Sequence, residues 1–295
     1  MIHMKNIYIL LLINTVVCFA QDSLPLSYSK DILSKLEQFS KEKNFEEGVK
    51  FIDNLNKNDS LYGSLLTTKS YYLINLEKYN DVINVANDGF ALKRPDLDFY
   101  FYINKGVALV NLKKYDEAIS LYDEGLKHFP KSYLLHYNKG TAYETMGKYK
   151  NAVAMYQEAI LLNPYYPKSH LQLGKIAYRQ KKIAQALLCF DTYLLISPDG
   201  DNSFSVLKLA NEALSQKNEN EAIEGFELSP DDKAFEQIDL ILTNRVALSD
   251  DYKIPSEIDV ALIKQSHALL ELIKTFKGNG GFWDKRYVPL FKWIA

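Results

Sequence analysis

Residues 132–164 decide the fold, and they read SYLLHYNKGTAYETMGKYKNAVAMYQEAILLNP. Small residues stand at Gly140 and Ala152, a ring follows at Tyr156, and the stretch ends at Pro164. The pattern predicts two helices that cross closely, because small side chains let the backbones approach and a ring four residues after the alanine fills the space beside the crossing. Proline ends the second helix because it lacks an N–H and clashes with the preceding turn.

The same columns recur every 34 residues on both sides of this stretch. They are Gly106, Gly140 and Gly174; Ala118, Ala152 and Ala186; and Pro130, Pro164 and Pro198, with rings at Tyr122, Tyr156 and Phe190. A fixed period of this length indicates a repeat architecture, in which one unit cannot bury its apolar face alone and neighbouring units must stack. We therefore predict an array of stacked helix pairs.

The repeat resembles the tetratricopeptide repeat (TPR) family, most clearly at Gly140, Tyr143, Gly147, Tyr149, Ala152, Tyr156, Ala159 and Pro164. The resemblance implies an all-α fold, a right-handed α-α superhelix (TPR solenoid), over residues 29–228. The array spans residues 63–200, with strong repeats at 99–132, 133–166 and 167–200. A degenerate helix pair at residues 21–62 precedes the array, and a degenerate repeat at 201–228 follows it.

Residues 229–295 do not fit the repeat and predict a C-terminal helical cap. Ser256-Glu257-Ile258-Asp259 reads as a capping box that opens a buried helix extending to about Phe276. After the break at residues 278–281 come five aromatic side chains, Phe282, Trp283, Tyr287, Phe291 and Trp293. These either cover the last repeat or form an aromatic docking patch. We favour the cap, because exposed clusters of aromatic side chains are unusual in a monomer.

Residues 1–20 predict a secretory signal peptide, with a basic start, an apolar run that ends at Val17, and small residues at Cys18 and Ala20. The run is shorter than the roughly 20 residues that a membrane-spanning helix needs. We expect cleavage after Ala20 and export. Cys18 offers an alternative, because bacterial lipoproteins are cleaved just before a cysteine that carries the lipid anchor. Val17 departs from the small residue that usually precedes such a cysteine.

Composition excludes several classes of protein. The 295 residues carry 35 basic and 37 acidic side chains, and the net charge of −2 provides no basic surface for binding nucleic-acid phosphates. A hydrophobic content of 47% is too high for a disordered chain. Two cysteines in a chain of this length cannot form a disulfide-stapled scaffold.

In the TPR family the first helix of each repeat lines an inner groove that holds partner segments. Transferred to this sequence, the resemblance implies partner contacts at Tyr100, Asn104, Tyr137, Asn138, Lys168, Lys175 and Arg179. The predicted groove changes from aromatic to basic along its length. Tyrosine combines a large contact area with a hydroxyl group. Lys175 and Arg179 are four residues apart on one helix, so both can reach one carboxylate.

Lys181 and Lys182 follow this basic pair and either extend it or form a solvated turn. Some TPR proteins grip acidic chaperone tails with a lysine and two asparagines at set columns. Here the lysine column holds Ile103 and Tyr137, which argues against such a clamp.

The sequence contains no phosphate-binding loop, nucleophile elbow or HExxH motif. His136 and His170 share a repeat column that is usually packed, and glycines occupy the positions four residues on where a second metal ligand would stand. Cys189 adjoins the ring column and is expected to be a buried, unreactive thiol. Glu257 and Asp259 would point to different faces of a helix, which disfavours a hydrolase acid pair. We therefore predict no catalytic residue, metal or cofactor.

The sequence predicts an exported, non-catalytic TPR scaffold that binds a protein or peptide segment of another envelope protein along its concave face. The expected location is the periplasm of a Gram-negative bacterium or the secreted fraction. The alternative is a lipid-anchored outer-membrane assembly or secretion component, and membrane attachment requires lipidation of Cys18.

Overall fold

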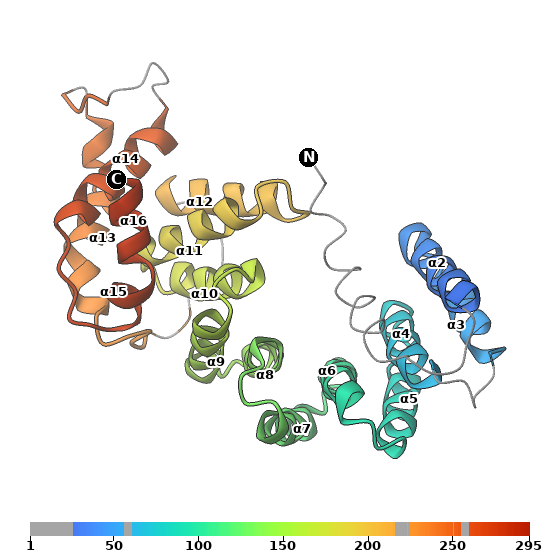
Figure 1. The fold of residues 1–295 in the computed structure, drawn as a ribbon. Coiled ribbons are helices and arrows are strands. Elements are labelled where there is room, and N and C mark those ends of the chain that lie inside the picture. Colours follow the sequence, from blue (N-terminus) through green and yellow to red (C-terminus); the bar gives the residue numbers. More distant parts are fainter. Residues whose placement is uncertain (1–25, 56–60, 216–222, 224, 250, 255–259) are drawn as a thin grey trace. The chain divides into compact units, whose positions relative to one another are not determined.

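The computed structural model describes residues 26–55, 61–215, 223, 225–249, 251–254 and 260–295. In these ranges the regular structure is helical, with fifteen α-helices and two short 3-10 helices (Figure 1), so the predicted all-α fold is confirmed. The α-helices are α2 (Leu26–Glu42), α3 (Phe45–Asp53), α4 (Tyr62–Asn75), α5 (Tyr79–Ala91), α6 (Pro95–Asn111), α7 (Tyr115–His128), α8 (Tyr133–Thr145), α9 (Tyr149–Leu162), α10 (Pro167–Arg179), α11 (Ile183–Ile196), α12 (Ser203–Ser215), α13 (Glu236–Thr243), α14 (Ala261–Thr275), α15 (Phe282–Arg286) and α16 (Val288–Ile294).

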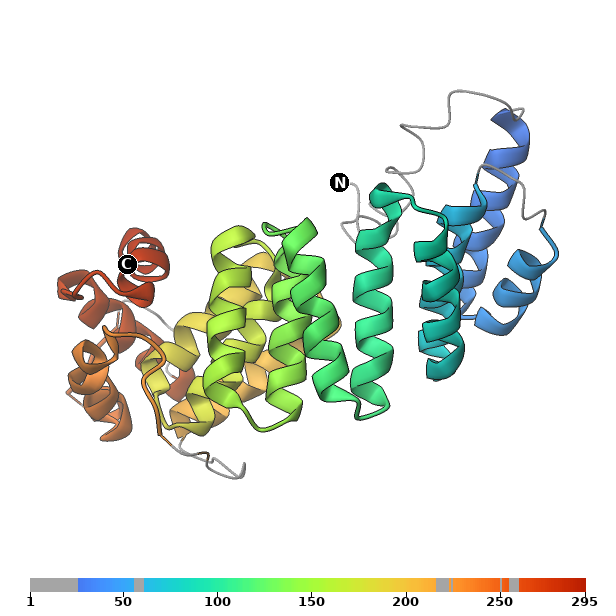
Figure 2. The ribbon, with the colours of Figure 1, turned by 90° about the horizontal axis from the view of Figure 1, so that it is seen from below.

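The chain divides into two compact units, residues 1–130 and 131–295. In the first unit, α2 pairs with α3, α4 with α5 and α6 with α7. In the second unit, α8 pairs with α9 and α10 with α11, and α12 packs on α11. Figure 2 shows the helices of residues 133–196, coloured green to yellow, lying side by side. The helix pairs α8/α9 and α10/α11 lie in two of the strong repeats predicted from the 34-residue period, and α6/α7 matches the repeat at 99–132 except that α6 begins earlier, at Pro95.

The glycine column marks close helix crossings, as the sequence predicts. A Cβ atom added at Gly140 would lie 2.7 Å from the ring of Tyr156, and one at Gly174 would lie 2.7 Å from the ring of Phe190. The same addition at Gly106 would overlap the ring of Tyr122. These distances are shorter than van der Waals contact, so each glycine allows a buried ring of the second helix to lie against the first helix.

Each turn between the two helices of a pair places one residue in the left-handed region. The φ angles are 55° at Lys43, 57° at Glu77, 61° at Lys113, 73° at Gly147 and 62° at Lys181. At the third of these turns, the N–H of residue 113 donates to the carbonyl of residue 110 and the N–H of residue 114 donates to the carbonyl of residue 109. This is the Schellman pattern of hydrogen bonds that ends a helix.

The degenerate repeat at residues 201–228 retains its first helix, α12, which packs on α11. Ala210 and Ala213, which keep the small residues of the repeat, are 2% and 1% exposed. Residues 225–228, where the second helix of a full repeat would continue, are not helical.

The C-terminal segment forms the predicted helical cap of the second unit. Trp283, Tyr287 and Phe291 are at most 2% exposed and belong to the same core as the rings and alanines of α9–α11. Trp293 is 83% exposed and does not take part. Helix α14 is buried along one stripe that includes Leu269 and Ile273, rather than on all sides as its composition predicts.

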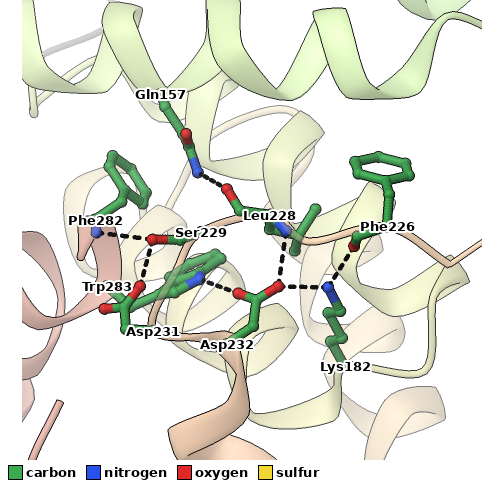
Figure 3. Close-up of polar contacts among 9 residues, drawn as sticks. All are labelled: Gln157, Lys182, Phe226, Leu228, Ser229, Asp231, Asp232, Phe282 and Trp283. Carbon is green, nitrogen blue, oxygen red and sulfur yellow. Dashed lines mark hydrogen bonds and ion pairs between the residues drawn. The ribbon is translucent and has the colours of Figure 1, made fainter. Parts of the chain in front are cut away.

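Two neighbouring aspartates join the cap to the repeats (Figure 3). The carboxylate of Asp232 accepts the backbone N–H of Leu228 at 2.7 Å and the indole N–H of Trp283 at 2.8 Å, and it also accepts the ammonium of Lys182 at the start of α11. Gln157 of α9 donates to the carbonyl of Leu228 at 2.7 Å. This junction satisfies the polar groups of a segment where the repeat pattern ends.

Asp231 orients the other side of the same junction. Its carboxylate accepts the backbone N–H of Asp284 at 2.7 Å. It also accepts the hydroxyl of Ser229, whose oxygen accepts the N–H of Phe282 at 2.9 Å (Figure 3). A Cβ atom at Gly281 would overlap the carboxylate of Asp231, so glycine is needed there for the close approach.

Residues 1–25, which include the predicted signal peptide and Cys18, lie outside the described residues, and so does the predicted capping box at 256–259. Among the helices that the structure describes, none has both the length and the apolar composition to span a membrane.

Candidate functional site

Helices α8, α9 and α10 bring together Tyr137, Glu144, Tyr156, Lys175 and Arg179, which we call the α8–α10 cluster. The carboxylate of Glu144 accepts the hydroxyl of Tyr156 at 2.6 Å. The cations of Lys175 and Arg179 act on the same carboxylate from α10. The expectation that this basic pair binds one carboxylate of a partner stays a prediction.

Burial dominates the electrostatics of the cluster. It raises the pKa of Glu144 above its usual range, while the Tyr156 hydroxyl, Lys175 and Arg179 act in the opposite direction. Burial also raises the pKa of Tyr137 and of Tyr156. Both hydroxyl groups therefore stay protonated and remain hydrogen-bond donors at physiological pH.

The guanidinium of Arg179 is held by Tyr149, which is not among the predicted partner contacts. Its Nη1 donates to the hydroxyl of Tyr149 at 3.0 Å, and its central carbon lies 4.9 Å from the centroid of the same ring. A planar guanidinium that stacks on a ring has lost part of its freedom before any partner binds, which lowers the entropy cost of binding.

The remaining predicted contacts in the second unit differ in accessibility. Lys168, at the start of α10, is exposed. Tyr137 is half-buried, and its ring packs against Tyr156 and Tyr166 with centroid distances of 5.7 and 5.1 Å. The side chain of Asn138 donates to the carbonyl of Leu134 in its own helix at 2.8 Å.

Tyr100 and Asn104 lie on α6 of the first unit, both half-buried. The side chain of Asn104 donates to the carbonyl of Thr67 on α4 at 3.4 Å. Their role in partner binding stays a prediction.

Lys182 neither extends the basic pair Lys175 and Arg179 nor lies in a solvated turn, the two alternatives that the sequence offers. Lys181 is exposed and occupies the left-handed turn position, whereas Lys182 donates to the carbonyl of Phe226 at 2.7 Å and to the carboxylate of Asp232 (Figure 3). Lys182 therefore anchors the cap. The sequence could not show this, because its partners are 44 and 50 residues away and outside the periodic pattern.

The described residues hold no group of three or more histidine, cysteine or carboxylate side chains suited to a metal ion. His170 is 2% exposed, and Cys189 is fully buried with its pKa raised by that burial. The interpretation of both residues as packed core positions is confirmed.

Comparison with known proteins identifies the repeat. Two family models of the tetratricopeptide repeat match the chain, one at residues 99–132 and the other at residues 133–166. Residues 99–166 of this chain are tetratricopeptide repeats. TPR domains bind proteins or peptides, and TPR proteins are generally non-catalytic scaffolds.

A solved structure gives the same fold. The crystal structure of TTC0263, a thermophilic TPR protein of Thermus thermophilus, aligns with a TM-score of 0.54 and 16% identity over 63% of this chain and 98% of that one. MamA (residues 41 to the end) of Desulfovibrio magneticus RS-1 aligns with a TM-score of 0.45 and 21% identity over 58% of this chain and 96% of that one. No curated protein matches the sequence.

Proposed function

We propose that this TPR protein is an exported, non-catalytic scaffold that binds a carboxylate-bearing segment of another envelope protein through the α8–α10 cluster and the adjacent Lys168. The observation that carries the proposal is the placement of two cations and two tyrosines around Glu144. Lys168 stands seven residues before Lys175, two turns away on the same side of α10, so this side of the helix adds a third cation and favours a segment that brings negative charge.

The cluster offers a partner both orientation and contact area. Arg179 is pre-positioned on the ring of Tyr149 and presents a planar fork of donors that suits a carboxylate. The tyrosine rings supply apolar area with a hydroxyl group at the edge. Affinity then comes from aromatic contact, and the direction of the bound segment comes from the basic residues.

The test is crosslinked capture from the native cell envelope with a charge-reversed groove. The double variant Lys168→Glu, Lys175→Glu should lose the partner that the wild type captures, because the cations become like charges facing the partner's carboxylate. The double variant Lys131→Glu, Lys150→Glu changes two exposed lysines of the same unit outside the cluster and should retain the partner. Equal capture by both variants would place the site elsewhere, provided that circular dichroism shows both to be folded.

Export rests on the pattern of residues 1–20 and has its own test. The mature protein should begin at Gln21 when it is isolated from the producing cell and its N-terminal peptide is sequenced. A mature protein that begins at a lipidated Cys18 would replace this proposal with the lipid-anchored component, and an uncleaved N-terminus would end both.

A further inference from the structure

A recess in the second unit lies between the start of α11, residues 225–227 and α13. It has a volume of about 330 Å³, and its lining includes Gln185, Phe226, Glu236 and Asp239. The recess shares no residue with the α8–α10 cluster. We call it the α11–α13 pocket.

Gln185 lines this pocket with an unused hydrogen-bond acceptor. Its side chain is 1% exposed, and its Oε1 atom has no hydrogen-bond partner within the described part of the chain. A buried amide oxygen without a partner costs about 1–3 kcal/mol, so such groups are normally satisfied by something that binds them. The pocket is far larger than the ~15 Å³ that one water molecule requires, so it has room for more than a bridging water.

Most of the charged side chains around the pocket are carboxylates, which accept hydrogen bonds. The acidic side chains are Glu227, Asp232, Glu236 and Asp239, and the basic ones are Lys182 and Lys233. Lys182 and Asp232 neutralise each other in the cap junction, which leaves three carboxylates facing one lysine. Glu227 and Glu236 are exposed at the mouth, where a group from outside can reach them.

Asp239 connects the pocket with the start of α11. Its Oδ1 accepts the backbone N–H of Ala184 at 2.7 Å, which satisfies one of the free amides at the N-terminus of that helix. Burial raises the pKa of Asp239 to about 7, and nearby Asp232 acts in the same direction. A cation in the pocket would relieve this penalty because it favours the charged carboxylate.

We propose that the α11–α13 pocket binds the side chain of an arginine carried by a partner protein. A guanidinium has five N–H donors and no acceptor, which fits a wall of carboxylates and one unpaired amide oxygen. It is also less strongly hydrated than an ammonium and stacks on aromatic faces, and Phe226 supplies a ring at this pocket. The inference rests on the protein-binding role proposed above but not on the α8–α10 cluster.

The test uses a small probe, so that it does not depend on knowing the partner. N-acetyl-arginine amide is titrated into the ¹⁵N-labelled mature chain, and N-acetyl-citrulline amide serves as the uncharged control of the same shape. The arginine probe should shift the side-chain amide signal of Gln185 in a saturable way, and the citrulline probe should not. Equal shifts with both probes, or no shift at Gln185, would overturn the proposal.

Matched variants locate the binding. Glu236→Gln should weaken binding of the arginine probe about threefold, as expected for loss of one exposed ion pair. Asp239→Asn keeps an oxygen for the N–H of Ala184 and should weaken binding more. Glu158→Gln removes an exposed carboxylate of α9 and should leave binding unchanged. If Glu236→Gln and Glu158→Gln bind alike, the arginine site is not in this pocket, whatever the envelope crosslinking shows for the α8–α10 cluster.

The pH dependence gives an independent readout with a defined sign. Between pH 8 and pH 6 the wild type should bind the arginine probe progressively more weakly, because Asp239, with its pKa raised to about 7, takes up a proton and loses its attraction for the cation. Asp239→Asn should show a flatter pH dependence over this range. A wild type with no pH dependence between these values would contradict the role of Asp239.

Discussion

The hydroxyl of Tyr287 forms the central link of a buried hydrogen-bonded chain. Burial lowers the pKa of His170 to about 4, so its imidazole is neutral at physiological pH. Its Nε2–H donates to the carbonyl of Pro164 at 2.9 Å, which leaves Nδ1 to accept the Tyr287 hydroxyl at 2.6 Å. Cys189 donates to the oxygen of Tyr287 at 3.3 Å. Residues of α10, α11 and the cap are thus joined by side chains that satisfy one another.

We predict that Tyr287→Phe destabilises the second unit by about 1–3 kcal/mol, because it leaves the Nδ1 of His170 and the thiol of Cys189 buried without partners. Urea unfolding followed by tryptophan fluorescence measures this effect, because both tryptophans, Trp283 and Trp293, lie in the second unit. Tyr165→Phe is the matched control, since Tyr165 is 77% exposed and should change stability little. A Tyr287→Phe variant as stable as this control would show that the hydrogen-bonded chain contributes nothing.

The limits of sequence-based prediction appear clearly at these residues. The column that His136 and His170 share predicts a packed histidine, and the position of Cys189 beside a ring predicts a buried thiol. Tyr287 is 117 residues from His170 in the sequence and lies in a segment without periodicity. Repeats predict contacts between neighbouring repeats, but no column predicts which residue of the cap meets the last full repeat.

At the level of elements, the turn inside each helix pair shows how one backbone conformation is shared by different residues. Gly147 and Lys181 are 34 residues apart, and their φ angles are 73° and 62°. Glycine adopts this conformation without steric cost, whereas an L-residue with a side chain pays about 1–2 kcal/mol for it. A Cβ atom at Gly147 would meet nothing within 4 Å, so the only cost of a side chain there is the strain of the left-handed backbone.

We therefore predict changes of opposite sign at the two turns. Lys181→Gly should stabilise the second unit by about 1 kcal/mol, and Gly147→Ala should destabilise it by about the same amount. Tryptophan-detected urea unfolding measures both variants. Lys181→Ala is the control, because alanine keeps the Cβ atom and with it the strain. If Lys181→Gly and Lys181→Ala give the same stability, the left-handed turn costs this lysine nothing.

The 34-residue period determines which elements could be predicted from the sequence, because only elements that recur in each repeat leave a periodic pattern. Lys113 and Gly147 are 34 residues apart and occupy the same turn position, so the turns follow the period of the repeat. In the α8–α10 cluster, the family resemblance assigns Tyr137, Lys175 and Arg179 to groove columns, and their role in partner binding stays a prediction. The contact of Arg179 with Tyr149 was not predicted, because Tyr149 belongs to a column that marks the start of the second helix.

For the whole molecule, the division into two compact units predicts two unfolding transitions. The rings and alanines of α9–α11 share one core with the cap, whereas the buried clusters that contain Leu66 and Ile52 lie in residues 1–130. In repeat proteins stability is a sum of local terms, because each repeat contacts only its neighbours. A destabilising substitution in one unit should therefore leave the stability of the other unit largely unchanged.

Two equivalent glycines make this testable. Gly106→Ala and Gly174→Ala each place a methyl group against a buried ring, Tyr122 in the first unit and Phe190 in the second. Each should cost about 1–3 kcal/mol through overpacking. Gly174→Ala should lower the urea midpoint seen by tryptophan fluorescence, whereas Gly106→Ala should leave it unchanged and reduce amide-exchange protection only between residues 61 and 130. Because both variants carry the same substitution at the same repeat position, an equal loss of tryptophan-detected stability would mean that the two units unfold as one, and the local account of stability would be wrong for this protein.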